Sequence, residues 1–182
     1  GNDVPKSPNR ILFVGALSSY HNDFLYKQAN SPRSYDIVLY GSGLETEKLE
    51  GKVDYKGFVS SDELIATAEG EYGLAWYGSS LEGGSGALGE YLQYNAPHKM
   101  SLYIRCGLPI IVWEKAGLAP FVKKNNVGIC ISSLTELEDI LPKISAGQYM
   151  EMKKNVLQIA DKLSRGYYCF KAIKQACADL GG

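Results

Sequence analysis

Six short apolar runs recur along the chain, and glycines close the first two of them. The runs span residues 11–14, 36–40, 53–58, 72–76, 108–113 and 127–131. Each run is shorter than a typical helix and is bounded by glycine, proline or polar residues, which favours buried strands. Because the runs are continuously apolar rather than alternating, we expect strands that are covered on both faces.

Helical signals lie between and after these runs. Ser60 with Glu63, and Ser133 with Glu136, have the spacing of a capping box, and Pro120 suits the first turn of a helix over residues 119–124. After Pro142 only helical periodicity remains, and Gly166 separates two amphipathic segments. The alternation predicts an α/β fold: a Rossmann-like, doubly wound parallel sheet of about six strands, with C-terminal helices. Ligands bind such sheets at the carboxyl ends of the strands.

The length of 182 residues suits one domain, and we assign residues 11–182 to it. Residues 1–10 are interpreted as a tag remnant followed by a polar lead-in. The net charge of −1 argues against nucleic acid or an anionic membrane surface as a partner. The first ten residues do not form a signal sequence and no apolar run could span a bilayer, so we expect a cytoplasmic protein.

The four cysteines and two histidines do not have metal-ligand spacing. No C-x-x-C pair occurs, and His21 and His98 are far apart in the sequence. We therefore expect no metal site, and we expect the cysteines to be reduced packing residues.

Several of the 20 glycines follow the predicted strands. Glycine allows backbone N–H groups to approach a phosphate, although a single glycine at a strand end can simply form a turn. For Gly15, which follows the first strand, both interpretations stay open. Residues 84–89 match G-x-G-x-x-G, but they do not directly follow a strand, so we do not expect a nicotinamide site. The glycines in question are Gly15, Gly41, Gly43, Gly78 and those of the loop over residues 83–89.

The segment over residues 95–109 carries the most specific signal. Pro97 predicts a helix start, where the first backbone N–H groups are unpaired, and Gly107 suits the position that ends the helix. Lys99 adds a full positive charge to this helix start, a combination suited to a diphosphate. At an isolated helix start, Lys99 would be an ordinary surface charge. At the carboxyl edge of a parallel sheet, we favour binding.

The motif P-x-K-x-x-x-Y-x-x-x-G-x-P-I-I over residues 97–111 resembles the donor half of GT-B glycosyltransferases. The order of the surrounding motifs agrees over roughly residues 11–180. The form of residues 95–109 is similar to one branch, the β-1,6-galactofuranosyltransferase-like sugar transferases, which include glucosyltransferases acting on bacterial adhesins. The segment that begins at Arg165-Gly-Tyr is similar to the same branch.

The resemblance implies a donor site. It implies that Lys99 contacts the donor diphosphate, that Gly15 lets the first loop approach the donor, and that Asn95, His98 and Ser101 shape the pocket. The implied nucleotide is uridine diphosphate, and no further cofactor is implied.

Ribose recognition departs from the family pattern. Many GT-B enzymes have a glutamate three residues after the lysine, where this chain has Leu102. The ribose would then be bound in another way, through Glu114 or through backbone groups.

The resemblance also implies a missing half. GT-B enzymes have two Rossmann-like domains, and the acceptor site and catalytic base belong to the amino-terminal one, so the catalytic residues of this chain are not assigned. We expect a hexosyl- or galactofuranosyl-type transferase as the full-length protein, with a glycan or glycoprotein acceptor and an inactive fragment. Two alternatives stay open, a non-catalytic binding or assembly module and a domain of a GT-B-fold sugar epimerase. Association with further copies of the chain also stays open.

Overall fold

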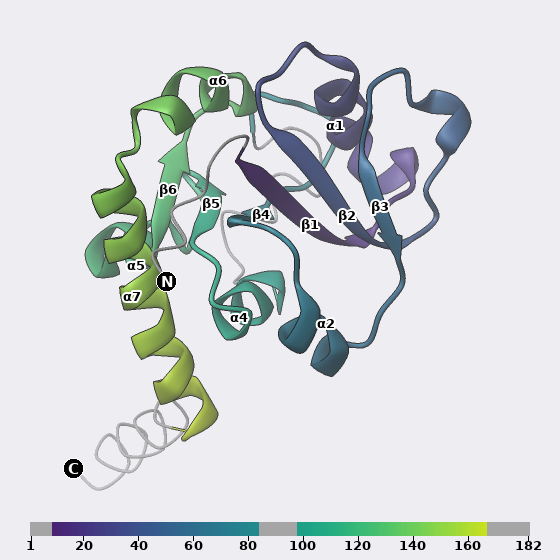
Figure 1. Cartoon of the computed structure of the whole chain (residues 1–182). Helices are drawn as coiled ribbons and strands as arrows, with labels where there is room; N and C mark the ends of the chain where they lie inside the picture. The colour runs from purple at the N-terminus through teal and green to yellow at the C-terminus, as the bar shows by residue number, and fades with distance from the viewer. Residues whose placement is uncertain (1–8, 84–97, 167–182) are drawn as a thin grey trace, which may run out of the picture.

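The computed structural model describes residues 9–83 and 98–166 and contains six strands there (Figure 1). All six predicted strands are confirmed, with boundaries shifted by a few residues. The strands are β1 (Arg10–Ala16), β2 (Asp36–Ser42), β3 (Asp54–Gly57), β4 (Tyr72–Ala75), β5 (Ile110–Trp113) and β6 (Gly128–Ile131). The helices of the same residues are α1 (Ser19–Asn30), α2 (Ser61–Thr67), α4 (His98–Arg105), α5 (Ala119–Asn125), α6 (Leu137–Ile140) and α7 (Ala146–Ser164). Short 3₁₀ turns lie at Thr46–Lys48, Leu134–Glu136 and Leu141–Lys143.

All the strands are parallel, and their order is β3-β2-β1-β4-β5-β6. The predicted Rossmann-like, doubly wound sheet is thereby confirmed. The chain starts in the middle of the sheet, proceeds to one edge and then returns to build the other side. The order therefore reverses between β1 and β4, which is where an open α/β sheet binds its ligands.

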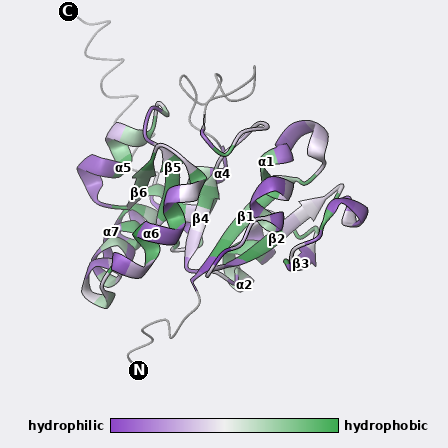
Figure 2. Ribbon diagram, turned by 90° about the horizontal axis from the view of Figure 1, so that it is seen from above, coloured by the Kyte–Doolittle hydropathy of each residue, from purple (hydrophilic) through white to green (hydrophobic). Residues whose placement is uncertain are grey.

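Apolar side chains cover both faces of the sheet, as the continuous apolar runs predict. One core cluster joins Phe13 and Ile111 of the strands to α1, α6 and the first part of α7. The other cluster joins Leu12 and Val112 to α2, α4, α5 and the later part of α7. Figure 2 shows the apolar strands in the middle of the molecule, between helices whose outer surfaces are polar.

Of the helix starts predicted at Ser60, Ser133 and Pro120, two are confirmed, and the start predicted at Pro97 lies outside the described residues. The Ser60 hydroxyl accepts a hydrogen bond from the backbone N–H of Glu63, and Pro120 lies in the first turn of α5. The capping box at Ser133 is wrong: a 3₁₀ turn begins there, and the Ser133 hydroxyl accepts from Thr135 instead. The Glu136 carboxylate bonds to Ser132, because this tight turn does not bring it back to Ser133.

Gly107 ends α4 as predicted. Its φ of +72° lies in the left-handed region that glycine tolerates. The N–H of Gly107 donates to the carbonyl of Ile104 over 2.9 Å, and that of Leu108 donates to Tyr103 over 3.0 Å. These two bonds form a Schellman motif, which turns the chain directly into β5.

The described cysteines, Cys106 and Cys130, are free and half-buried, and burial raises the pKa of both thiols. The other two cysteines, the glycines of 84–89 and Asn95 lie outside the described residues. No helix within residues 9–83 and 98–166 is long and apolar enough to cross a membrane.

Candidate functional site

The strands β1 and β4 separate toward their carboxyl ends, and Tyr103 of α4 joins them there. The two strands pair only at Ile11 with Tyr72 and at Leu12 with Gly73. Beyond that, the Tyr103 hydroxyl donates to the carbonyl of Leu74 over 2.9 Å and accepts from the N–H of Val14 over 3.1 Å. A buried tyrosine thus replaces the missing ladder bonds at the point where the strand order reverses.

Gly73 is what allows the Tyr103 ring to lie so close to the sheet. A Cβ at Gly73 would lie 2.3 Å from Cγ of Tyr103, which no real side chain tolerates. The ring of Tyr103 is completely buried. The absence of a side chain at one position of β4 therefore sets the distance between α4 and the sheet.

Lys99 lies one helical turn before Tyr103, so both side chains leave the same face of α4. The Lys99 Nζ lies 3.8 Å from the centre of the Phe13 ring and 4.1 Å from that of Tyr77. Phe13 packs in the core on the α1 side of the sheet, whereas α4 covers the opposite side. The end of the Lys99 side chain therefore reaches across the carboxyl edge of β1, at the separation from β4.

Gly15 leaves the space through which Lys99 crosses this edge. A Cβ at Gly15 would lie 3.0 Å from Cε and 3.1 Å from Nζ of Lys99. Gly15 has a φ of +137°, and its neighbour in the sheet, Gly41, has a φ of +147°. A Cβ at Gly41 would collide with the Gly15 carbonyl oxygen at 1.8 Å. The two strand-end glycines thus form a close backbone contact beside the amine.

The environment of Lys99 disfavours its charge. The residue as a whole is half-buried, but its Nζ is enclosed and has no hydrogen-bond partner among the described residues. Attraction to each ring favours an ammonium by about 0.5–2 kcal/mol, whereas removing a charge from water costs several kcal/mol. Desolvation outweighs the rings and lowers the pKa of Lys99 to about 7.

Several helices begin at this edge of the sheet, and the start of α1 is already occupied. The Glu45 carboxylate accepts from the N–H of Ser19 over 2.6 Å and from Lys48 over 2.7 Å. The hydrogen bond from Lys48, followed by that from Ser19, lowers the pKa of Glu45 to about 2, so the start of α1 holds a fixed carboxylate. The start of α4, which carries Lys99, lies at the same edge.

The structure brings together some of the predicted site residues. Gly15 and Lys99 are adjacent. His98 is the first residue of α4, and its side chain is exposed. Glu114 is exposed directly after β5, at the same carboxyl edge. Ser101 is exposed and lies two residues beyond Lys99, so it leaves a different side of α4.

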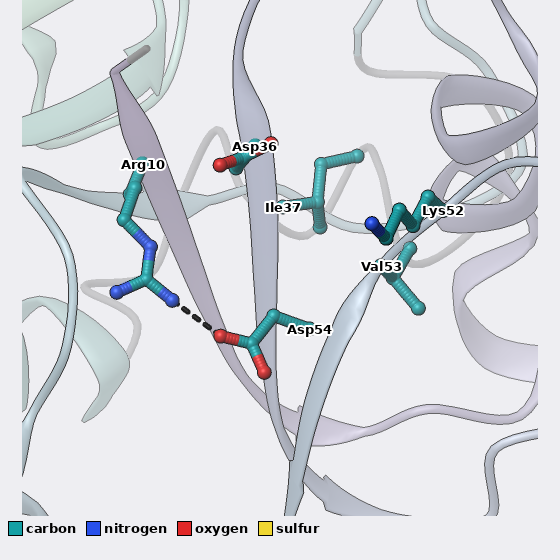
Figure 3. Close-up of a pocket in the computed structure, with 6 residues that line it drawn as sticks. All are labelled: Arg10, Asp36, Ile37, Lys52, Val53 and Asp54. Atoms are coloured by element: carbon teal, nitrogen blue, oxygen red, sulfur yellow. Dashed lines mark hydrogen bonds and ion pairs between the residues drawn. The ribbon is translucent and has the colours of Figure 1, made fainter. Parts of the chain in front are cut away.

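The opposite, amino edge of the sheet contains a hollow of about 310 Å³ (Figure 3). It is lined by Arg10, Asp36, Ile37, Lys52, Val53 and Asp54, from the ends where β1, β2 and β3 begin. In Figure 3 the Arg10 guanidinium points at Asp54, with which it forms an ion pair. This hollow is far from Lys99 and its charges neutralise one another. Within the described parts of the chain, no group of three His, Cys, Asp or Glu side chains could hold a metal ion.

Three contributors to the site were missed from the sequence: Phe13, Tyr77 and Tyr103 as a strand bridge. The spacing of Lys99 and Tyr103 by four residues places both on one helix face, and that signal was available. No comparable signal exists for the aromatic rings, because each belongs to a strand end that approaches α4 only in the folded sheet.

The fold and the site together define an open, Rossmann-like α/β domain with Lys99 and the start of α4 at its switch point. The family model described as Glucosyltransferase 3-like, C-terminal domain matches residues 11–176, and the chain belongs to that family. This confirms its recognition as the C-terminal domain of a GT-B glycosyltransferase.

Two curated relatives show the extent of the likeness. The β-1,6-galactofuranosyltransferase WbbI of Escherichia coli K12 is 32% identical over 181 residues, which cover 98% of this chain and 52% of WbbI. Glucosyltransferase 3 of Streptococcus gordonii is 28% identical over 177 residues, 97% of this chain and 50% of the relative. The chain thus spans about half the length of these relatives.

Solved structures share the fold at low sequence identity. HepE of Anabaena, solved in complex with UDP-glucose, has a TM-score of 0.57 at 16% identity, over 94% of this chain and 50% of HepE. WaaG, a glycosyltransferase involved in lipopolysaccharide biosynthesis, has a TM-score of 0.53 at 18% identity, over 88% of this chain and 44% of WaaG.

Proposed function

We propose that this chain is the donor-binding half of a glycosyltransferase and that it binds a nucleotide sugar of the uridine diphosphate type. The observation that carries the proposal is the Lys99 amine, which is enclosed at the β1–β4 switch point without a hydrogen-bond partner among residues 9–83 and 98–166. A cationic group with no partner in this part of the chain, next to two glycines and a helix start, is suited to an external polyanion. The complex of the similarly folded HepE with UDP-glucose supports this choice of ligand.

The chemistry proposed for Lys99 is stabilisation of the leaving group. When the bond between the sugar and the diphosphate breaks, negative charge develops on the departing phosphate oxygen. An ammonium and the backbone N–H groups at the start of α4 would stabilise that charge without reorganisation of water. To reach a diphosphate, the Lys99 side chain has to turn outward from its rings, and its flexible four-carbon stem permits this.

The remaining parts of the reaction are assigned to the other half of the enzyme. The relatives are about twice as long as this chain, so we place the acceptor site and the catalytic base outside it. Hexosyl or galactofuranosyl transfer to a glycan or glycoprotein is proposed for the longer protein only. The free thiols of Cys106 and Cys130 support the proposed cytoplasmic location. Asn95, His98, Ser101 and Glu114 remain proposed contacts of the donor.

Calorimetric titration of the chain with UDP-glucose tests the proposal. We expect binding to weaken by about 10- to 100-fold in Lys99→Met, because a charge-assisted hydrogen bond is lost while the apolar stem is retained. Lys124→Met removes an exposed lysine of α5 and serves as the matched control, with unchanged affinity. If neither UDP-glucose nor UDP-galactofuranose binds at millimolar concentration, the proposal is wrong and a non-catalytic module becomes the better interpretation.

A further inference from the structure

We infer that donor binding at this site is coupled to the uptake of one proton by Lys99. In this view the side chain exists as a neutral amine withdrawn between Phe13 and Tyr77, and as an ammonium that contacts the diphosphate. The inference rests on the proposed function and deepens it, because it predicts how donor affinity depends on pH.

The geometry of the withdrawn amine is the first argument. Nζ lies about equally far from two aromatic rings, 3.8 Å from Phe13 and 4.1 Å from Tyr77, in space that the missing side chain of Gly15 leaves open. Within the part of the chain that the structure describes, no oxygen accepts a hydrogen bond from Nζ. An ammonium has three N–H donors that all require acceptors when water is removed, so this enclosure suits the neutral amine better.

The second argument is that no acid among the described residues compensates the charge. On β1 the neighbours are Phe13 and Gly15, and neither side chain titrates. On α4 the neighbours are His98, which is exposed, and Tyr103, whose pKa is raised by burial so that its hydroxyl stays neutral. After β4 the neighbour is Tyr77, a phenol.

The carboxylates of the same edge are engaged elsewhere or exposed. Glu45 binds Ser19 and Lys48, Glu82 accepts from Ser133, and Glu114 is exposed after β5. No ion pair within the described residues includes Lys99. The lowered pKa of Lys99, about 7, agrees with the geometry and makes the coupling measurable near neutral pH.

A diphosphate reverses this balance. Its two negative charges supply the acceptors and the countercharge that the enclosure lacks, so the bound state favours the ammonium strongly. If the pKa of Lys99 in the free chain is about 7, about half of the free molecules are protonated there at pH 7, and we expect nearly all of the complexes to be protonated. The affinity for the donor therefore falls as the pH rises, by about tenfold from pH 6 to pH 8.

Calorimetry in pairs of buffers measures the protons directly. UDP-glucose is titrated into the chain in PIPES and in Tris at the same pH, and the difference in heat gives the number of protons taken up. We expect uptake of about 0.1 proton at pH 6, about 0.5 at pH 7 and about 0.9 at pH 8. UDP-glucose is used rather than UDP because a terminal phosphate titrates near pH 6 and would add its own protons.

Two substitutions identify the group. Lys99→Arg carries a charge at every pH of the series, so it should bind without proton uptake. Lys99→Met should bind UDP-glucose weakly, and its affinity should not fall as the pH rises above 7. His98→Gln removes the neighbouring imidazole, and uptake between pH 7 and pH 8 should persist in it. Thermal unfolding of each variant shows that the chain is folded.

A measurement without ligand keeps the two proposals separate. The ¹³Cε resonance of Lys99, assigned by comparison with Lys99→Arg, should titrate near neutral pH in the free chain. UDP-glucose binding with no proton uptake at pH 7 and pH 8 would overturn the coupling and leave the donor site intact. A Lys99 that titrates near pH 7 in a chain that binds no nucleotide sugar would instead overturn the proposed function.

Discussion

At the scale of single residues, the contact between Gly15 and Lys99 is the most sensitive point of the site. Gly15→Ala places a methyl group 3.0 Å from Lys99 Cε and forces a side chain onto a φ of +137°. We expect a loss of about 1–3 kcal/mol in the free energy of unfolding and a weaker affinity for UDP-glucose, because the amine is displaced. Urea unfolding and calorimetry measure the two effects.

Gly57→Ala is the matched control for backbone strain. Gly57 also has a positive φ, +78°, but a Cβ there would meet nothing within 4 Å. The Gly57→Ala variant should lose stability through the same kind of backbone strain and keep its affinity for UDP-glucose. Equal losses of affinity in the two variants would show that strain, rather than contact with Lys99, disturbs the site.

The sequence predicted Lys99 as a binding residue at a helix start, but it did not predict the aromatic rings that surround the amine. Pro97 and Gly107 predict a short helix in the sequence, and a lysine at its start follows from local rules alone. The ring of Phe13 comes from β1 and that of Tyr77 from the segment after β4, and the two meet only when these strands become neighbours. The withdrawn, partly neutral state of the amine depends on that meeting, so local patterns could not predict it.

At the scale of elements, Tyr103 fixes α4 against the sheet. In Tyr103→Phe, the N–H of Val14 and the carbonyl of Leu74 each lose a buried partner. We expect a loss of about 1–3 kcal/mol in the free energy of unfolding. We also expect weaker UDP-glucose binding, because Lys99 leaves the same helix face one turn earlier.

A second tyrosine provides the comparison. The Tyr149 hydroxyl donates to the carbonyl of Glu71 over 3.1 Å, just before β4 at the amino edge of the sheet. In Tyr149→Phe the free energy of unfolding should fall by about 1 kcal/mol, and the affinity for UDP-glucose should not change. A Tyr103→Phe variant with full affinity would show that α4 does not need this bond to position Lys99.

The start of α1 leads to a prediction about pH. Glu45 has a depressed pKa, so its contribution to stability is complete above its ordinary pKa near 4.5 and is lost as the pH falls toward about 2. The wild type should therefore unfold at a higher temperature than Glu45→Gln at pH 6, and the difference should shrink toward pH 2. Thermal melts of both proteins between pH 2 and pH 6 measure it. A difference that is independent of pH would assign the effect to shape rather than charge.

The elements with local sequence signals were predictable, whereas the Glu45 carboxylate at the start of α1 was not. The six strands, the Ser60 cap, Pro120 and the Gly107 turn each follow from a few neighbouring residues. Glu45 lies 26 residues from Ser19, and only the parallel pairing of β1 with β2 brings the two loops together. The capping box predicted at Ser133 did not form for a different reason. The backbone there makes a 3₁₀ turn, which is too tight for the capping-box hydrogen bonds.

At the scale of the whole molecule, the two edges of the sheet have different chemistry. The carboxyl edge holds the glycines of β1 and β2 and an amine that has no hydrogen-bond partner in the described part of the chain. The amino edge holds a closed ring of charges from Arg10, Asp54, Lys56 and Glu69. Each charge of the ring meets two opposite ones, at 3.1 Å between Lys56 and Glu69 and 3.2 Å between Lys56 and Asp54. A satisfied ring holds strands together, whereas an unsatisfied cation attracts a ligand.

Asp54→Asn tests this division of roles across the molecule. The substitution removes one charge from the ring, that of the partner of Arg10 in Figure 3, and leaves a side chain of the same size. The ring is partly exposed, so we expect a stability loss of about 1 kcal/mol or less, which shrinks further in 1 M salt because screening shortens the range of the charges. Donor affinity should not change, since the ring lies at the opposite ends of the strands from Lys99. Urea unfolding at low and high salt, with calorimetry of UDP-glucose, separates the two effects. A loss of donor affinity in Asp54→Asn without a loss of stability would mean that the amino edge takes part in binding, contrary to the assignment of the site to the switch point.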